Sequence, residues 1–182
     1  MSLAGLLVRR LTHDFAGPVG AIGTAVDMGA GGDPELEALI ADGAAGLAAT
    51  LQLYRFIATP NLGVVASSEA RSLVATWLAA RGNVRLDWPG DDEWPADIAR
   101  LTAGLAMVAA DTRASAIVVA RGRVSIDVAI DPGVAAVFGG AAPTTTRHAI
   151  AGLLAEQAVE SGLAIEVADG VLSLYQASAL PR

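Results

Sequence analysis

The first sixty residues are dominated by two long stretches of helical periodicity, separated by a run of glycines. Over residues 2–28, apolar side chains recur every three or four positions, which predicts one long helix that ends at the GAGG of residues 29–32. Asp33 is a suitable N-cap with Pro34 at the first helical position, and the helical period then continues to about Thr59. The sequence therefore predicts an antiparallel helical hairpin over residues 1–60.

Such a hairpin cannot bury both of its apolar faces by itself. A second copy of the hairpin would complete a four-helix bundle, so we expect a homodimer formed through residues 1–60. The alternative is that the hairpin packs against the second half of the same chain. The sequence leaves both arrangements open.

From about Val64 the pattern changes to alternating strands and helices. The pattern predicts helices at 68–80 (capped by Ser67 or Ser68), 95–110 and 144–161, strands at 83–88, 115–120, 123–130, 163–167 and 171–175, a loop at PGDDEWP and a break at FGGAAP. The last two strands flank Asp169-Gly170, a dipeptide that favours tight turns. This order predicts an α/β sandwich over residues 64–182, with helices on one sheet face, and an α+β fold class for the whole chain.

Composition excludes several classes of function. The net charge of −7 argues against a general nucleic-acid binder, which would need a basic face. The chain has no cysteine, and all twelve basic residues are arginine, so thiol chemistry, a P-loop lysine and Schiff-base chemistry are excluded. No run approaches about 18 uninterrupted apolar residues, and no signal-peptide pattern is present, so we expect a cytoplasmic protein that does not bind a membrane.

His13, one of only two histidines, lies roughly opposite the apolar face of the first predicted helix. Its helical neighbours are Arg9 one turn before and Gly17 and Gly20 after it, with Pro18 between the glycines. Glycine and proline weaken a helix interior, so three of them beside an exposed imidazole suggest a site that something large approaches closely. The alternative is an ordinary surface histidine with glycines as packing notches.

The string HDFAGPVGAI resembles the H-box of the histidine kinase dimerisation helix, in which an acidic residue and, four positions later, a proline follow the phosphorylated histidine. Here these residues are His13, Asp14 and Pro18. Together with the element order of residues 64–182, the string is similar to the ChpT-type histidine phosphotransferases of alphaproteobacteria. These proteins resemble a histidine kinase that has lost its ATP site. The resemblance implies a dimeric bundle followed by a degenerate kinase ATP-binding domain.

The positions that bind ATP in the kinases are altered in this sequence. The asparagine positions of the kinase motif correspond to Gly104 and Val108, neither of which can ligate magnesium. Asp131-Pro132-Gly133 lacks the second glycine of the kinase segment, and Gly139-Gly140 is at best a trace of the glycine-rich lid. We therefore expect no bound cofactor and no ATP-dependent phosphorylation of His13, which favours a relay over a kinase.

The resemblance assigns roles to the residues around His13. The imidazole would accept a phosphoryl group on Nε2 from the aspartate of one receiver domain and pass it to another, while Asp14 holds Nδ1 or remains a solvated charge. Arg9 and Arg10 would neutralise the phosphoryl group or meet the acidic pocket of a receiver, unless they are ordinary solvated arginines. Magnesium would come with the receiver. The residues expected to face a partner are Arg9, Arg10, Gly17, Pro18, Gly20 and Arg55.

Other interpretations remain open. An active histidine kinase, a phosphatase with Asp14 as general base, or a non-catalytic receiver-binding scaffold would each fit the same helix. We interpret His148 as a structural histidine and Trp77, Trp88 and Trp94 as fillers of an alanine-rich core. No metal site is expected, because the two histidines lie far apart in sequence and no carboxylate cluster has the spacing of metal ligands.

Overall fold

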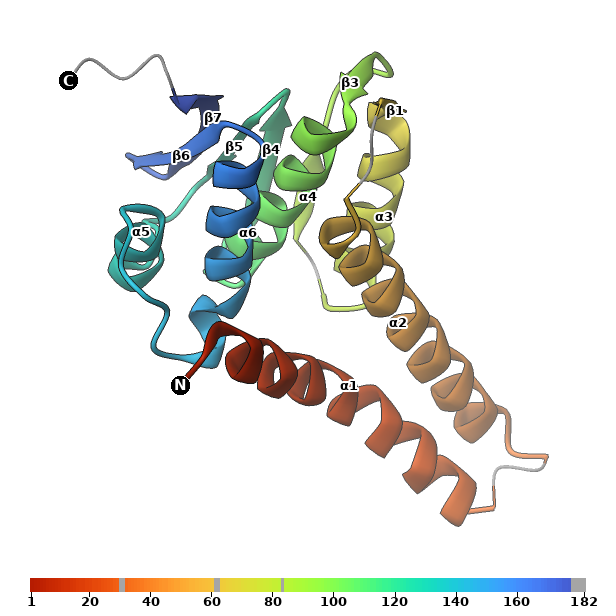
Figure 1. Ribbon diagram of the computed structural model, residues 1–182. Helices are drawn as coiled ribbons and strands as arrows, with labels where there is room; N and C mark the ends of the chain where they lie inside the picture. Colours follow the sequence, from red (N-terminus) through yellow and green to blue (C-terminus); the bar gives the residue numbers. More distant parts are fainter. Residues whose placement is uncertain (30–31, 61–62, 83, 178–182) are drawn as a thin grey trace.

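The computed structural model describes residues 1–29, 32–60, 63–82 and 84–177. It begins with the predicted hairpin of α1 (Leu3–Asp27) and α2 (Pro34–Ala58), which extends away from the rest of the molecule (Figure 1). Ser2 caps α1 by accepting the N–H of Gly5, and Asp33 caps α2 as predicted. Ala30, Gly31, Asn61 and Asn83, which the sequence assigned to turns or a strand end, lie outside the described residues.

The second part combines short strands with helices. Its elements are β1 (Val64–Ala66), α3 (Ser67–Ala79), β2 (Arg85–Asp87), β3 (Glu93–Pro95), α4 (Ala96–Ala110), β4 (Ala116–Ala120), β5 (Arg123–Ile126), α5 (Pro132–Phe138), the 3-10 turn η1 (Thr146–His148), α6 (Ala149–Glu160), β6 (Leu163–Ala168) and β7 (Val171–Gln176). The chain is thus mixed α+β, with a helical hairpin followed by a sheet domain, as the sequence predicted.

Five strands form the main sheet, in the order β2-β4-β5-β7-β6. Only β2 and β4 pair in parallel, and the other neighbours are antiparallel. Ile117, Val119 and Leu172 are buried under the helices, whereas Val118 on the opposite face is 42% exposed. This alternation makes a two-layer sandwich with helices on one face. The β6–β7 turn holds Asp169 and Gly170 at positive φ, the conformation that a tight hairpin needs.

Three local predictions were wrong. The PGDDEWP segment is not only a loop, because β3 lies at its end and pairs with the unpredicted β1. These strands have three residues each and join segments about 30 residues apart, so a local pattern cannot indicate them. The short helix α5 was also missed, although Asp131 caps it and Pro132 opens it. Neither Ser67 nor Ser68 caps α3, because the helix begins at Ser67 and the hydroxyl of Ser67 donates to the carbonyl of Gly90.

The core lies around α4, which is buried on nearly every side. Because its residues are mostly alanine, larger side chains from neighbouring elements fill the space. Trp77 and Trp94 are almost fully buried, and Trp88 stacks on Trp94 with ring centroids 5.6 Å apart. The tryptophans therefore fill the core, as expected.

The hairpin shares this core at one end only. Leu53, Phe56 and Ile57 of α2 belong to the same buried cluster as the sheet domain, so the hairpin packs in part against its own chain. The distal part of the hairpin leaves Val19 and Val26 more than half exposed. Within the described residues, α2 is the one helix long and apolar enough to cross a membrane by length and composition alone.

Candidate functional site

His13 lies near the middle of α1 with its side chain 84% exposed. The backbone around it remains helical through Gly17 and Pro18. The imidazole therefore projects from the hairpin into solvent, on the outer face that the helical period predicted. An exposed imidazole on a continuous helix is accessible to a macromolecular partner.

Asp14 follows His13 but is directed inward, and its side chain is only 1% exposed. Its Oδ1 lies 3.2 Å from Nδ1 of His13. A carboxylate at this distance favours the imidazole tautomer with the proton on Nδ1, which leaves the lone pair of Nε2 directed to solvent. Asp14 is therefore not a solvated charge. The imidazole of His13 is exposed to solvent, whereas the carboxylate of Asp14 is buried and fixes the orientation of the ring.

Two side chains, Arg10 and Tyr54, hold Oδ2 of Asp14 in place. Its Oδ2 accepts a hydrogen bond from Nε of Arg10 at 2.9 Å and one from the hydroxyl of Tyr54 at 2.8 Å. Arg10 also pairs with Asp111, at the end of α4, through Nη1 and Nη2 at 2.7 Å and 3.0 Å. The network thus connects α1, α2 and the sheet domain behind the imidazole.

Arg10 differs from the solvated or partner-facing arginine that we expected. It is only 6% exposed, and both ends of its guanidinium are occupied by carboxylates. Its guanidinium lies between Asp14 and Asp111, at the buried wall of the cavity that His13 also lines. Because Asp111 lies 101 residues from Arg10 in sequence, only the tertiary structure shows this pairing.

The electrostatics of the network favour its charged state. Burial alone would raise the pKa of Asp14, but the hydrogen bonds and charge of Arg10, with those of Tyr54 and His13, bring the pKa below its usual value. Burial alone would lower the pKa of Arg10. The hydrogen bonds and charges of Asp111 and Asp14 have a larger effect, so the pKa of Arg10 is raised. Burial and the charge of Asp14 raise the pKa of Tyr54, which stays a hydrogen-bond donor.

Residues of the sheet domain complete the surroundings of His13. A cavity of about 240 Å³ beside the imidazole is lined by Arg10, His13, Asp14, Arg81, Asp111, Thr146 and Arg147. Arg81 stacks over the ring of Trp77 at 4.7 Å, with Nη1 4.0 Å from Oδ2 of Asp14. Two further arginines, Arg81 and Arg147, and Thr146 therefore line the cavity beside the imidazole. Sequence analysis missed Arg81, Thr146, Arg147 and Asp111, because no local signal connects them to α1.

The remaining residues expected to face a partner are distributed over the hairpin. Arg9 is exposed one turn before His13, and Arg55 is exposed on α2 without lining the cavity. Gly17 and Gly20 are exposed, and a Cβ on either would meet no atom within 4 Å. The packing-notch interpretation is therefore wrong for these two glycines. Pro18 is half-buried beside them.

A second cavity is lined by Val108 and Asp131, two of the positions that the resemblance aligns with the kinase nucleotide site, and it is poorly suited to a nucleotide. It measures about 180 Å³, whereas small-molecule pockets are commonly about 300 Å³ or larger. Val108 lies in its wall, and a Cβ on Gly104 would lie 2.3 Å from Cδ2 of Leu154. Oδ1 of Asp131 is already used to cap α5. The residues present therefore do not fit ATP.

His148 is mostly buried next to this second cavity. Its Nε2 lies 3.4 Å from Oδ1 of Asp131, and its side chain is 13% exposed. This environment agrees with a structural histidine. Among the described residues, no group of three or more histidine, aspartate or glutamate side chains is arranged to hold a metal ion.

Comparisons with known proteins connect this architecture to solved structures. No protein-family model matches the chain, and no curated protein matches it. A solved structure described as "1.7 Angstrom Structure of a Bacterial Phosphotransferase" superposes with a TM-score of 0.74, at 19% sequence identity over 95% of each chain. The chain therefore has the fold of a bacterial phosphotransferase along nearly its whole length.

Proposed function

We propose that this protein is a dimeric histidine phosphotransferase of a bacterial two-component phosphorelay, acting in the cytoplasm. His13 would accept a phosphoryl group from the aspartate of one receiver domain and pass it to the aspartate of another. The observation that carries the proposal is the contrast between His13, 84% exposed, and the Asp14 that holds its Nδ1, 1% exposed. The fold shared with a bacterial phosphotransferase supports a phosphotransfer role.

The chemistry requires a neutral imidazole with a free Nε2. The lone pair of Nε2 attacks the phosphorus of a receiver's aspartyl phosphate in line, and the N–P bond forms as the bond between phosphorus and the aspartate oxygen breaks. The receiver regains its carboxylate, and the phosphorylated imidazole becomes positive while keeping its proton on Nδ1. Asp14, 3.2 Å from Nδ1, stabilises that charge. The reverse sequence transfers the group to the second receiver.

The surroundings of His13 suit a charged phosphoryl group. Arg81 and Arg147 line the same cavity as His13, and Thr146 adds a hydroxyl donor. Arginine stabilises the spread negative charge of a phosphoryl group in flight. Exposed Arg9 lies on the approach side and would meet the acidic, magnesium-binding pocket of a receiver, which brings the metal with it.

Exposed apolar side chains along both helices of the hairpin support the dimer. Val8, Val19 and Val26 are 62%, 54% and 58% exposed and lie within about 20° of one another around α1. On α2, exposed Leu51 continues the line of half-buried Ile40 and Leu47. Two apolar stripes on neighbouring helices are what a second hairpin would cover in a four-helix bundle.

The decisive experiment follows radiolabelled phosphate from a phosphorylated receiver domain with magnesium. Wild-type protein should gain an acid-labile label, and His13→Ala should gain none. Magnesium–ATP alone should label neither protein. The proposal fails if His13→Ala carries the label as well as wild type does.

The same assay separates the alternatives. Label gained from ATP would indicate a kinase, against the altered nucleotide site. Release of inorganic phosphate from the receiver without labelled protein would indicate a phosphatase, and receiver binding without either reaction would indicate a scaffold. His148→Ala is the matched control, because it removes the other histidine and should leave labelling unchanged.

A further inference from the structure

Arg81 is placed beside the candidate reactive site by two different contacts. It follows α3, and its guanidinium carbon lies 4.7 Å from the ring centroid of the fully buried Trp77. Its Nη1 lies 4.0 Å from Oδ2 of Asp14, whose other oxygen, Oδ1, lies 3.2 Å from Nδ1 of His13. Arg81 and the imidazole therefore lie against the two oxygens of one buried carboxylate.

The two carboxylates that face Arg81 already have nearer donors. Oδ2 of Asp14 accepts hydrogen bonds from Arg10 and Tyr54 at 2.9 Å and 2.8 Å. Oδ1 of Asp111 accepts one from Arg10 at 3.0 Å. The nitrogens of Arg81 remain 4.0 Å and 3.8 Å from these two oxygens, which is beyond hydrogen-bond distance. Arg81 can therefore turn away from both carboxylates while Arg10 keeps them paired.

The cavity that Arg81 and His13 line carries an excess of positive charge. Three formal positive charges face two negative ones there, from Arg10, Arg81, Arg147, Asp14 and Asp111. The whole chain, by contrast, has a net charge of −7. The side chain of Arg81 is 36% exposed, so it is accessible to a group attached to His13. An anionic group on the imidazole is therefore favoured at this cavity.

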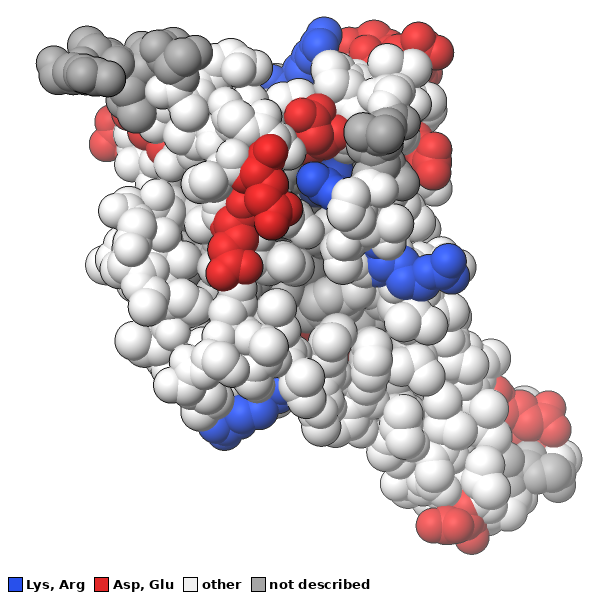
Figure 2. Space-filling model, viewed as in Figure 1, with Lys and Arg blue, Asp and Glu red and all other residues white. Residues whose placement is uncertain are grey.

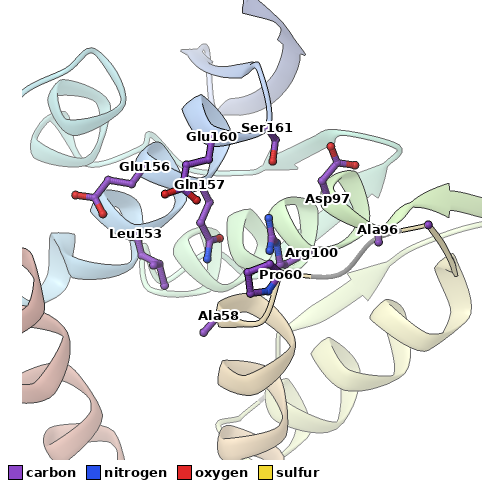
Figure 3. A pocket seen from close by; sticks show the side chains of 11 residues that line it. Ala58, Pro60, Ala96, Asp97, Arg100, Leu153, Glu156, Gln157, Glu160 and Ser161 are labelled. Atoms are coloured by element: carbon purple, nitrogen blue, oxygen red, sulfur yellow. The ribbon is translucent and has the colours of Figure 1, made fainter.

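A larger cavity elsewhere has the opposite balance of charge. It measures about 540 Å³ and lies between the end of α2, the start of α4 and the last turns of α6 (Figure 3). Its described lining residues include three carboxylates and one arginine, namely Asp97, Glu156, Glu160 and Arg100. Figure 2 shows acidic side chains gathered over α6 on this face. A phosphoryl anion is disfavoured there, so the positive excess beside His13 is a local property of that cavity.

From these contacts we infer that Arg81 binds the phosphoryl group once it is on His13, and so sets how far the group passes from a receiver's aspartate to this protein. The guanidinium turns from Asp14 and Asp111 to the phosphoryl oxygens while it stays over the ring of Trp77. Arg81 neither gives nor takes a proton. Because the contact persists after transfer, it stabilises the phosphorylated protein and opposes transfer onward. The inference rests on the proposed function, since it requires a phosphoryl group on His13.

The distribution of label between the two proteins tests the inference. Labelled phosphorylated receiver with magnesium is mixed with each variant, and the ratio of label on the variant to label on the receiver is measured once it is constant. Arg81→Gln should lower this ratio by about fivefold to tenfold, the effect of losing a charge-assisted hydrogen bond at a partly exposed site. Arg81→Lys keeps the charge and should recover part of the loss.

The matched control is Arg71→Gln, which should leave the ratio unchanged. Arg71 also belongs to the α3 region, its side chain is 38% exposed, and it pairs with Asp91 at 2.8 Å. A general effect of removing a half-exposed arginine would therefore appear in this variant as well.

Chemical phosphorylation gives a second readout that needs no receiver. Phosphoramidate donates its phosphoryl group to an exposed imidazole, and the N–P bond to Nε2 forms as the bond from phosphorus to the leaving ammonia breaks. Phosphorus-31 NMR then follows the last proton of the phosphoryl group, on the signal that is absent from His13→Ala. In wild type this proton should be lost at a pH about half a unit to one unit lower than in Arg81→Gln, because the guanidinium favours the dianion. A purely structural role of Arg81 would not move this titration.

The outcomes separate the inference from the proposed function. If a receiver labels no protein but Arg81→Gln still changes the titration, the proposed function fails and the assignment of Arg81 to the phosphoryl group stands. The inference is overturned if Arg81→Gln matches wild type in the titration, or in the ratio where a receiver does transfer. If Arg81→Gln does not fold, the Nε–H NMR signal of Arg81, identified by its absence from Arg81→Lys, should move when wild type is phosphorylated. An unmoved signal also overturns the inference.

Discussion

The hydroxyl of Tyr54 on α2 donates to Oδ2 of Asp14 on α1 at 2.8 Å, while Oδ1 of the same carboxylate lies 3.2 Å from the imidazole of His13. One buried carboxylate therefore connects the two helices of the hairpin to the candidate reactive side chain. Stability and reactivity should change together when this carboxylate loses a partner.

Replacing Tyr54 with phenylalanine removes one donor and little volume. We expect Tyr54→Phe to lower the free energy of unfolding by about 1–2 kcal/mol, because a buried carboxylate oxygen loses a hydrogen bond. Transfer to His13 should slow by a few fold, since Asp14 is held less firmly. Urea unfolding and labelled-phosphate kinetics measure the two effects. Unchanged stability would mean that this hydrogen bond contributes nothing.

Replacing Asp14 with asparagine breaks a buried ion pair. Asp14→Asn should lower the free energy of unfolding by about 3 kcal/mol, at the low end for such pairs because Arg10 keeps Asp111. Phosphate transfer should fall further than in Tyr54→Phe, because the charge beside Nδ1 is lost. Asp27→Asn, at an exposed position on the same helix, is the control and should change stability by less than about 0.5 kcal/mol.

The ion pair of Asp14 with Arg10 predicts that the free energy of unfolding depends on pH. The pKa of Asp14 is lower in the folded protein than its ordinary value of 3.8, so its contribution to stability is complete above that value. The contribution disappears as the pH falls through the lower folded pKa. The stability difference between wild type and Asp14→Asn should therefore be constant from about pH 5 to 7 and shrink below about pH 4. Urea unfolding of both proteins at each pH measures it, and a difference that grew on acidification would contradict the assignment.

The glycines after His13 allow a test that separates stability from partner access. A Cβ on Gly17 or Gly20 meets nothing within 4 Å, so Gly17→Ala and Gly20→Ala should each stabilise the protein by about 1 kcal/mol. If a receiver approaches the bare backbone, the added methyl groups should also slow transfer by about tenfold, through overpacking of the interface. Gly23→Ala, equally unobstructed but more distant from His13, should show the stabilisation alone. Stabilised variants with full transfer rates would remove these glycines from the docking surface.

The apolar stripe of α1 predicts the oligomeric state. Val19→Asp places a charge at a position 54% exposed in the single chain, so the chain itself should fold normally. In a four-helix bundle the same charge would be buried, and the dimer should dissociate. Light scattering coupled to gel filtration should give the dimer mass for wild type and for Val159→Asp, a control at an exposed position on α6, and the monomer mass for Val19→Asp. A monomeric wild type would refute the dimer.

The elements with strong local signals could be predicted from the sequence. The hairpin was found because its helices are long, periodic and capped, with Asp33 and Pro34 opening the second one. The three-residue strands β1 and β3 could not be found, because their pairing depends on contacts about 30 residues apart. Predicted boundaries also ran too far in β5, which ends at Ile126.

The candidate site was predicted only in part, because some of its residues meet through contacts that are distant in sequence. His13, Asp14 and their helical neighbours lie on one helix, where sequence spacing fixes geometry. The burial of Arg10 depends on Asp111, and Arg81 and Arg147 arrive from the sheet domain. Residues brought together over 70 or more positions leave no local pattern in a single sequence.

The pairing of Arg10 with Asp111 also limits how the molecule can move. The hairpin could swing away from the sheet domain only by separating these buried charges, at a cost of about 3–5 kcal/mol. At that cost the open form would make up less than about 1% of the population. Arg81, Thr146 and Arg147 would then already stand beside His13 before any partner arrives. Binding of a partner would then require little ordering of the surface around His13. The association rate would be limited by diffusional encounter and not by a conformational change of this protein.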